Sequence, residues 1–263
     1  MMENNKTHTY MSFHRAKALL FAALILFVTL SAVSCDNDDD SFPIFPLNRP
    51  NAIVTVKPSA DGSTFTMQLD DSTTITASNI KAAPYGNKEV RAFVNYRLLT
   101  QSEGKRNYEV YVNWIDSVLT KPMAENLGGN LNVDTYCQDP VEILRDWTVA
   151  EDGYLTIHFR TQWAASGTPH FVNLVATDPS NPYDLTFFHN AQGVKGGYWG
   201  DGIVAFALNR LPDTGTREVD ITLHWQSFSG EKSVTFKYST RHGVKKINGL
   251  SFAASGQFEK AIK

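Results

Sequence analysis

The chain has 263 residues, of which 42% are hydrophobic, and its formal charge at pH 7 is −3. A chain of this length and composition has room for one or two globular domains with apolar cores. Without residues 1–34 it carries 21 basic and 26 acidic residues, a charge of −5, and no basic stripe remains. Nucleic acid is therefore excluded as an expected partner.

The first 34 residues have the pattern of a secretory signal peptide. A basic stretch at 14–17 precedes the apolar run 18–33, and the small residues Ser31–Ser34 end at Cys35. An apolar run of this length is short of the roughly 20 residues that a membrane-spanning helix needs. The pattern therefore favours a cleaved leader over the alternative, an uncleaved membrane helix.

The end of this leader resembles a known modification signal. Residues 32–35 read Ala-Val-Ser-Cys and resemble the lipobox of bacterial lipoproteins, with Ala32 in place of the preferred leucine. The resemblance implies that Cys35 receives a thioether-linked diacylglycerol and an acyl chain on its new amino group. Several acyl chains hold a protein firmly to a membrane, since each buried methylene contributes about 0.8 kcal/mol. Cys137 would then lack a disulfide partner, and we interpret it as a small buried residue, with a reactive thiol as the alternative.

The five residues after Cys35 form an acidic run: Asp36, Asn37, Asp38, Asp39 and Asp40. One interpretation is a solvated spacer that self-repulsion keeps extended. The other is an address, because the run resembles the surface-export signal of Bacteroidetes lipoproteins. That resemblance implies a protein held in the outer membrane by lipid on Cys35 and facing the cell exterior. With the three prolines of 42–50, residues 35–50 are predicted to form a tether.

The pattern of residues 51–118 predicts a small antiparallel β-barrel. Strands are expected at 52–56, 64–69, 89–99 and 107–118, and Asp61-Gly62 predicts a hairpin turn between the first two. Two of these strands alternate, which predicts the faces that line the core: Val90, Ala92, Val94, Tyr96 and Leu98 in one, and Tyr108, Val110, Val112 and Trp114 in the other. About five strands in roughly 70 residues is the size of such a barrel.

Residues 119–135 break this pattern and are predicted to be a linker, because Lys121-Pro122 and Leu127–Asn130 are loop signals. Strands resume over 136–242 at the spacing of a β-sandwich. They are expected at 154–163, 170–177, 185–189, 203–209, 217–228 and 233–240. No amphipathic helix of ordinary length is predicted, and 243–263 is expected to be a loosely ordered tail.

Several segments resemble the NigD-like lipoproteins of Bacteroidetes. The resemblance lies in the acidic run after Cys35, in the segment Asp139–Phe159, and in Phe188–Gly193. It implies an OB-like N-terminal barrel followed by a C-terminal β-sandwich, in agreement with the strand pattern. The predicted fold class is therefore all-β. The family supplies no catalytic residue, and its name comes from a gene beside a bacteriocin, which implies an immunity role as one hypothesis.

No catalytic constellation is apparent in the sequence. The five histidines after the leader lie in neither an HExxH motif nor a paired metal-ligand spacing: His158, His170, His189, His224 and His242. We interpret them as solvated surface residues. There is no Gly-x-Ser-x-Gly elbow, and Ser229–Glu231 is typical of a hairpin turn. The sequence therefore predicts a protein that is not an enzyme, with no catalytic residue, metal site or cofactor.

The glycine-rich segment Gly193–Gly202 is the candidate for binding. It lacks Walker spacing, and we expect a long, mobile loop with Tyr198, Trp199 and Asp201 at its tip. Exposed aromatic rings beside a carboxylate can stack on sugars or anchor an interface, although Trp199 could instead pack over an open sandwich end.

The function that this sequence predicts is a binding, structural or protective role at the bacterial surface, with a surface glycan or an envelope protein as partner. Three alternatives stay open. The first is a glycan-binding accessory protein of a polysaccharide-uptake system, the second is a bacteriocin immunity protein, and the third is a hydrolase whose groups converge only in space.

Overall fold

The structure is a computed structural model that describes residues 47–99, 106–215 and 217–241. The predicted signal peptide, Cys35, the acidic run and the tail 243–263 lie outside the described residues, as does His242. In the described part, strands β1 to β13 are accompanied by one α-helix, α2, and no helix there is long and apolar enough to cross a membrane.

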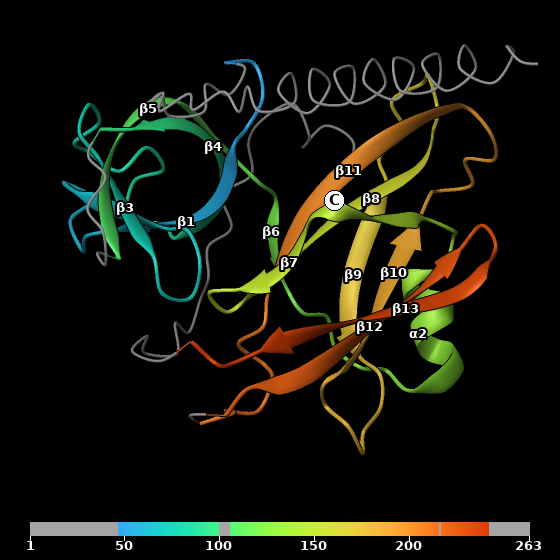
Figure 1. Ribbon diagram of the computed structural model, residues 1–263. Coiled ribbons are helices and arrows are strands. Elements are labelled where there is room, and N and C mark those ends of the chain that lie inside the picture. The colour runs from blue at the N-terminus through green and yellow to red at the C-terminus, as the bar shows by residue number, and fades with distance from the viewer. Residues whose placement is uncertain (1–46, 100–105, 216, 242–263) are drawn as a thin grey trace, which may run out of the picture. The chain divides into compact units, whose positions relative to one another are not determined.

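The first domain is a closed five-stranded barrel (Figure 1). Its strands are β1 (Ala52–Pro58), β2 (Phe65–Gln68), β3 (Thr74–Ala77), β4 (Val90–Leu98) and β5 (Asn107–Ser117), in the order β1-β2-β3-β5-β4. Antiparallel pairing of β1 with both β2 and β4, and parallel pairing of β3 with β5, close the sheet. The alternating apolar residues of these strands fill the interior, so the predicted barrel is confirmed.

The predicted core face of β5 is wrong at one residue. A register shift in β5 pairs Asn95 with Trp114 but Tyr96 with Val112, so that Asn113 is left as a β-bulge. One extra residue reverses the alternation that follows it, and Ile115 therefore packs on the barrel core in place of Trp114. The Trp114 ring packs instead on a cluster shared with the second domain.

The second domain is a sandwich of two four-stranded sheets (Figure 1). One sheet has the order β6-β11-β8-β7, with β6 (Thr120–Pro122), β7 (Glu142–Glu151), β8 (Tyr154–Trp163) and β11 (Tyr198–Ala207). The other has the order β13-β12-β10-β9, with β9 (Phe171–Ala176), β10 (Asp184–Asn190), β12 (Val219–Ser227) and β13 (Gly230–Tyr238). Inward side chains of both sheets form the main apolar core, and this confirms the all-β prediction of a barrel followed by a sandwich.

Four elements in and before the sandwich differ from the sequence-based expectation. β6 and helix α2 (Gly129–Tyr136) lie largely within the segment expected to be a linker, and β6 pairs with β11 in parallel. β11 begins five residues earlier than expected, inside the predicted loop. β7 was not predicted, because a bulge between Leu144 and Val149 breaks its alternation.

The barrel and the sandwich share a small apolar cluster. Ile53 and Phe93 of the barrel pack there against Ile203 of β11. Trp147, in the β7 bulge, adopts a φ of 66° and places its ring edge-on to Phe93, with centroids 5.3 Å apart. A bulky residue in this left-handed conformation costs about 1–3 kcal/mol, and the packing between the domains offsets that cost.

Candidate functional site

Two exposed aromatic side chains, Trp199 and Phe228, form an aromatic surface at one end of the sandwich, and their exposed fractions are 53% and 44%. Tyr198 is 60% exposed but lies on the opposite face of β11, toward Trp163. The Trp199 and Phe228 rings touch with centroids 5.0 Å apart and planes at 64°. Phe228 lies in the turn between β12 and β13, and sequence reasoning missed it because a single aromatic residue in a hairpin turn has no periodic signal.

The backbone under this surface is part of the sheet. Tyr198 and Trp199 begin β11, which pairs with β8 from Tyr198 opposite Trp163 onward. A Cβ atom on Gly197 would lie 2.2 Å from the Trp163 carbonyl oxygen, and one on Gly200 would lie 2.7 Å from the Trp163 ring. The expectation of a long mobile loop is therefore wrong from Tyr198 on, since these glycines allow a close approach that joins the segment to the sheet.

A buried histidine pair lies beneath Trp163. The His170 ring stacks on Trp163 at 4.2 Å, and its Nδ1 lies 2.8 Å from Nε2 of His189. Nδ1 of His189 lies 3.1 Å from the carbonyl oxygen of Asp139. Burial lowers the pKa of both imidazoles, and the neighbouring His170 helps to lower that of His189 to about 4. The pair is therefore neutral at pH 7.

The prediction of solvated histidines is wrong for this pair, because both side chains are almost completely buried. The alternation of β10 contained the signal, since His189 shares its inward face with Leu185 and Phe187. His158 and His224 do lie on polar strand faces, where each has a carboxylate within 3.2 Å, Asp201 and Asp184 respectively.

Asp201 is an anchored side chain within β11. Nε and Nη2 of Arg160 donate to its two carboxylate oxygens at 2.6 and 3.0 Å, and Nε2 of His158 lies 3.2 Å from Oδ2. The hydrogen bonds from Arg160 hold the pKa of the Asp201 carboxyl below its usual range. Register places Trp199 opposite Gln162 and Asp201 opposite Arg160, so a ring, an amide and an ion pair share one sheet face.

The other candidate chemistry of the sequence is not assembled in the described residues. They hold no group of three or more His, Cys, Asp or Glu side chains that could bind a metal ion. Cys137 is half-buried at the end of α2, with a φ of 61°. Burial and the nearby Asp139 raise the pKa of its thiol, which disfavours the reactive thiolate.

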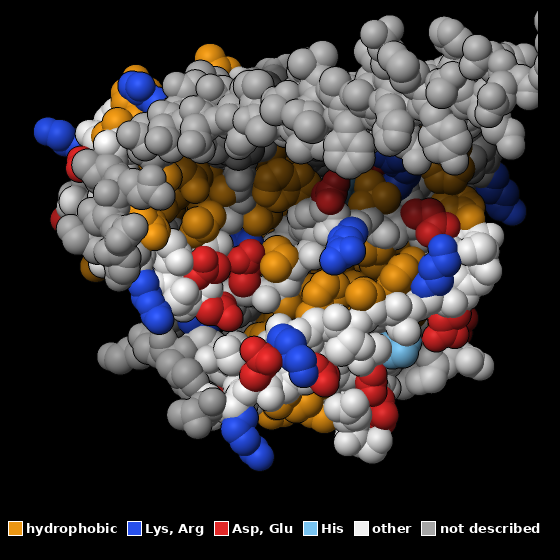
Figure 2. All heavy atoms as spheres, in the orientation of Figure 1, with side chains coloured by type: hydrophobic (Ala, Val, Ile, Leu, Met, Phe, Trp, Pro, Cys, Tyr) orange, Lys and Arg blue, Asp and Glu red, His pale blue; other side chains and the backbone are white. Residues whose placement is uncertain are grey.

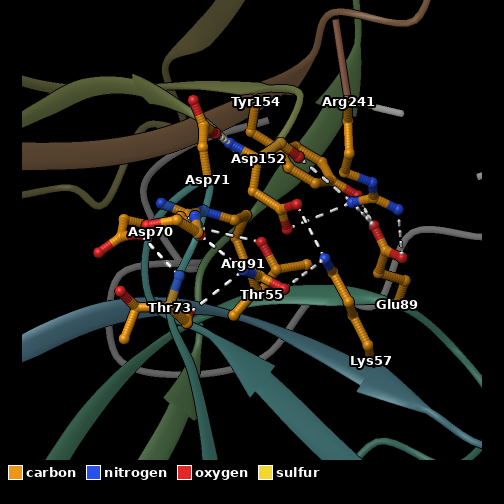
Figure 3. A network of polar contacts seen from close by, with 12 residues as sticks. Thr55, Lys57, Asp70, Asp71, Thr73, Glu89, Arg91, Asp152, Tyr154 and Arg241 are labelled. Atoms are coloured by element: carbon orange, nitrogen blue, oxygen red, sulfur yellow. Dashed lines mark hydrogen bonds and ion pairs between the residues drawn. The ribbon is translucent and has the colours of Figure 1, made fainter. Parts of the chain in front are cut away.

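A second polar site, the charged interface, joins the barrel to the sandwich (Figure 3). Asp152, in the turn between β7 and β8, is 3% exposed and accepts hydrogen bonds from Lys57 at 2.8 Å and from Arg241 at 3.3 Å. Arg241 also donates to both carboxylate oxygens of Glu89 at 2.7 and 2.8 Å. The backbone N–H of Asp152 donates to Asp71 at 2.6 Å. One sandwich turn is thus tied to three separate segments.

The charged interface also contains a fully buried cation. Nη1 of Arg91 donates to Thr55 at 3.1 Å, and Nη2 lies 3.9 Å from Oε1 of Glu151. Burial raises the pKa of Glu151 to about 7, the charge of Arg91 opposes this rise, and Asp71 adds to it. Because these charged side chains pair with one another, we interpret the charged interface as a structural contact between the two domains. Sequence reasoning missed it because its partners are up to 152 residues apart.

Charges elsewhere on the molecule are also interspersed. Figure 2 shows acidic and basic side chains lying next to one another on the drawn face, without a broad area of one sign there. The fold and the two sites together define a two-domain all-β protein with a charged interface between its domains and an exposed aromatic surface.

Comparison with protein families identifies the chain. Residues 53–118 match the NigD-like N-terminal OB domain, and residues 123–238 match the NigD-like C-terminal beta sandwich domain. Together these matches cover more than half of the sequence. The chain therefore belongs to the NigD-like family.

Solved structures agree with this assignment. A protein named as toxin-related from Parabacteroides distasonis is 34% identical, with a TM-score of 0.61 over 72% of this chain and 92% of that one. A protein of unknown function from Bacteroides vulgatus is 21% identical, with a TM-score of 0.58 over 76% and 95%. A NigD-like immunity protein from Bacteroides caccae is 20% identical, with a TM-score of 0.53 over 75% and 99%. The last two show a common fold. No curated protein matches the chain.

Proposed function

We propose that the chain is a lipid-anchored protein of the bacterial cell envelope that binds a partner through its aromatic surface and catalyses no reaction. The observation that carries the proposal is the exposure of Trp199 and Phe228 in contact with each other, with the Trp199 backbone held in the sheet. Large aromatic side chains that stay exposed together are typical of contact surfaces, where Trp and Tyr supply much of the binding free energy.

The support beneath the rings favours binding. Gly197 and Gly200 hold the segment against Trp163, which is itself stacked on the buried His170. A surface that is already ordered loses less conformational entropy when a partner binds. Two large rings could each contribute about 1–2 kcal/mol if a partner buried them.

The binding test compares the Cys35→Ala protein, which lipid cannot hold to a membrane, with the same protein carrying Tyr198→Ala and Trp199→Ala in addition. We expect the variant to bind isolated cell envelopes at least about ten-fold more weakly. Its melting temperature should be unchanged, because the two rings that it lacks are exposed to solvent in the free protein. Tyr111→Ala is the matched control, since Tyr111 is an aromatic residue of the barrel that is 38% exposed. Equal binding by all three proteins, or a double variant that melts several degrees lower, would contradict the proposal.

The anchor rests on the lipobox-like sequence that ends at Cys35. Cys35→Ala should leave a protein without lipid that no longer partitions into detergent, and mass spectrometry of the mature N-terminus reads out the modification. An intact leader, residues 1–34, on the mature protein would contradict the anchor. Replacing the acidic residues of 36–40 with alanine tests the export signal, because protease shaving of whole cells should then spare the variant.

The second candidate function is immunity to a bacteriocin. The names of two similar solved structures support an immunity role: one is named as toxin-related and one as a NigD-like immunity protein. Expression of the chain in a sensitive strain, followed by challenge with a bacteriocin encoded beside its gene, tests this role. Protection that survives the Tyr198→Ala, Trp199→Ala changes would place the function away from the aromatic surface.

A further inference from the structure

The polar side chains beside the aromatic surface limit the class of ligand that can bind there. Arg160 uses two of its five N–H donors on Asp201, and its side chain remains 48% exposed. Gln162 lies opposite Trp199, and its Oε1 accepts a hydrogen bond from the backbone N–H of Gly196. These contacts fix the planes of a guanidinium and an amide next to the Trp199 ring and leave further N–H groups for a ligand.

Four charged side chains next to the rings form ion pairs within the protein. Arg160 is paired with Asp201, and Lys232 of β13 is paired with Glu142 of β7 at 2.9 Å. Ser227, which directly precedes Phe228, also donates to Glu142 at 2.7 Å. A polyanion or polycation needs uncompensated charges on its receptor. This surface therefore favours an uncharged partner.

The size of the aromatic surface favours a small binding unit. Aromatic side chains bury about 150–250 Å² each when fully covered, so the two rings of Trp199 and Phe228, which are about half exposed, offer on the order of 200 Å². A stable protein–protein interface buries about 800 Å² on each partner. The aromatic surface is thus better matched to one or two units of a repeating polymer than to a protein face.

We infer that the aromatic surface binds an uncharged pyranose unit of a glycan. The apolar C–H face of the sugar would stack on the Trp199 ring, and the inclined Phe228 ring would contact the side of the sugar. The sugar hydroxyls would accept hydrogen bonds from the free N–H groups of Arg160 and Gln162. A pyranose combines an apolar face with a rim of hydroxyls, and this surface combines rings with fixed planar donors. The inference rests on the proposed function and names its ligand class.

The test uses affinity electrophoresis of the full-length protein in detergent. Native gels contain either a neutral polysaccharide (soluble starch, mannan or xylan) or the acidic polygalacturonate. We expect at least one neutral polymer to retard the protein and polygalacturonate not to. Trp199→Ala should weaken the retardation at least ten-fold, Trp199→Phe should retain part of it because a ring remains, and Tyr111→Ala should match the unchanged protein.

Three results would overturn the inference: retardation by polygalacturonate alone, no retardation by any neutral polymer, or equal retardation of Trp199→Ala and the unchanged protein. Circular dichroism of each variant confirms its folding, and Phe228→Ala replaces any variant that unfolds. If neutral polymers fail while binding to cell envelopes still requires Trp199, the inference is wrong and the proposed function stands. If neither assay depends on Trp199, both are wrong.

Discussion

The charged interface and the histidine pair bury polar side chains in opposite ways. At the interface, Arg91 has no exposed surface and keeps its charge beside Glu151 and Asp152, whose carboxylates come from the other domain. In the sandwich, His170 and His189 hydrogen-bond to each other and lose their charge through burial. Arginine cannot be deprotonated at ordinary pH, whereas histidine can, so only the histidines can avoid the cost of a buried charge.

The largest expected effect comes from removing the buried cation. Arg91→Ala should lower the free energy of unfolding by about 3–5 kcal/mol, because it leaves Glu151 and its acidic neighbours without their buried counter-charge. Arg160→Ala, which removes a partly exposed ion pair, should cost about 1 kcal/mol or less. Urea unfolding of both variants measures the difference. Equal losses would show that the charged interface is no stronger than a surface pair.

A substitution at Gly197 should disrupt the close packing of its segment on Trp163, the residue that stacks on His170. Its φ is 130°, and a Cβ atom there would clash with the Trp163 carbonyl, so Gly197→Ala should cost about 3 kcal/mol. Gly196 is the control, because it also has a positive φ but has no atom within 4 Å of an added Cβ. Gly196→Ala should cost about 1 kcal/mol. Thermal unfolding that ranks the two alike would contradict the close packing on Trp163.

The histidine pair should destabilise the fold in acid. The pKa of His189 is about 4 in the folded chain against 6.5 for the free side chain, so the unfolded chain binds more protons between these values. Its contribution is complete above pH 6.5 and is lost as the pH falls toward 4, a loss of about 3 kcal/mol. His189→Gln should remove this loss. Urea unfolding of both proteins at a series of pH values tests this expectation. If the free energy of unfolding depends on pH in the same way in both, His189 is not a buried neutral imidazole.

The charged interface should respond to pH with the opposite sign. The pKa of Glu151 is raised from 4.5 to about 7, so its contribution is present below pH 4.5 and is lost as the pH rises through 7. After allowance for partial exposure, we expect a loss of about 2 kcal/mol. The two effects oppose each other between pH 4.5 and 6.5. The free energy of unfolding of Glu151→Gln should therefore fall more steeply, as the pH is lowered from 6.5 to 4.5, than that of the unchanged chain. A shallower fall for the variant would contradict a raised pKa of Glu151.

Local pattern was sufficient for most of the strands and for their inward faces. In β8, Leu155, Ile157 and Phe159 follow an alternation that the structure retains, and the inward position of His189 follows the same rule. Alternation is local because successive side chains of a strand point to opposite faces. It failed where inserted residues interrupted the period, at the β5 bulge before Trp114 and at the β7 bulge that contains Trp147.

The sequence by itself determined the class of the fold, the order of its two domains and most of the residues that line their cores, because these depend on hydrophobic periodicity along neighbouring residues. Only the tertiary structure decided which distant groups meet. Arg241 reaches Glu89 across 152 positions, and Phe228, in the turn between β12 and β13, reaches Trp199 of the other sheet. Such contacts depend on strand order and on how two domains pack, and a chain leaves no periodic trace of either along its sequence.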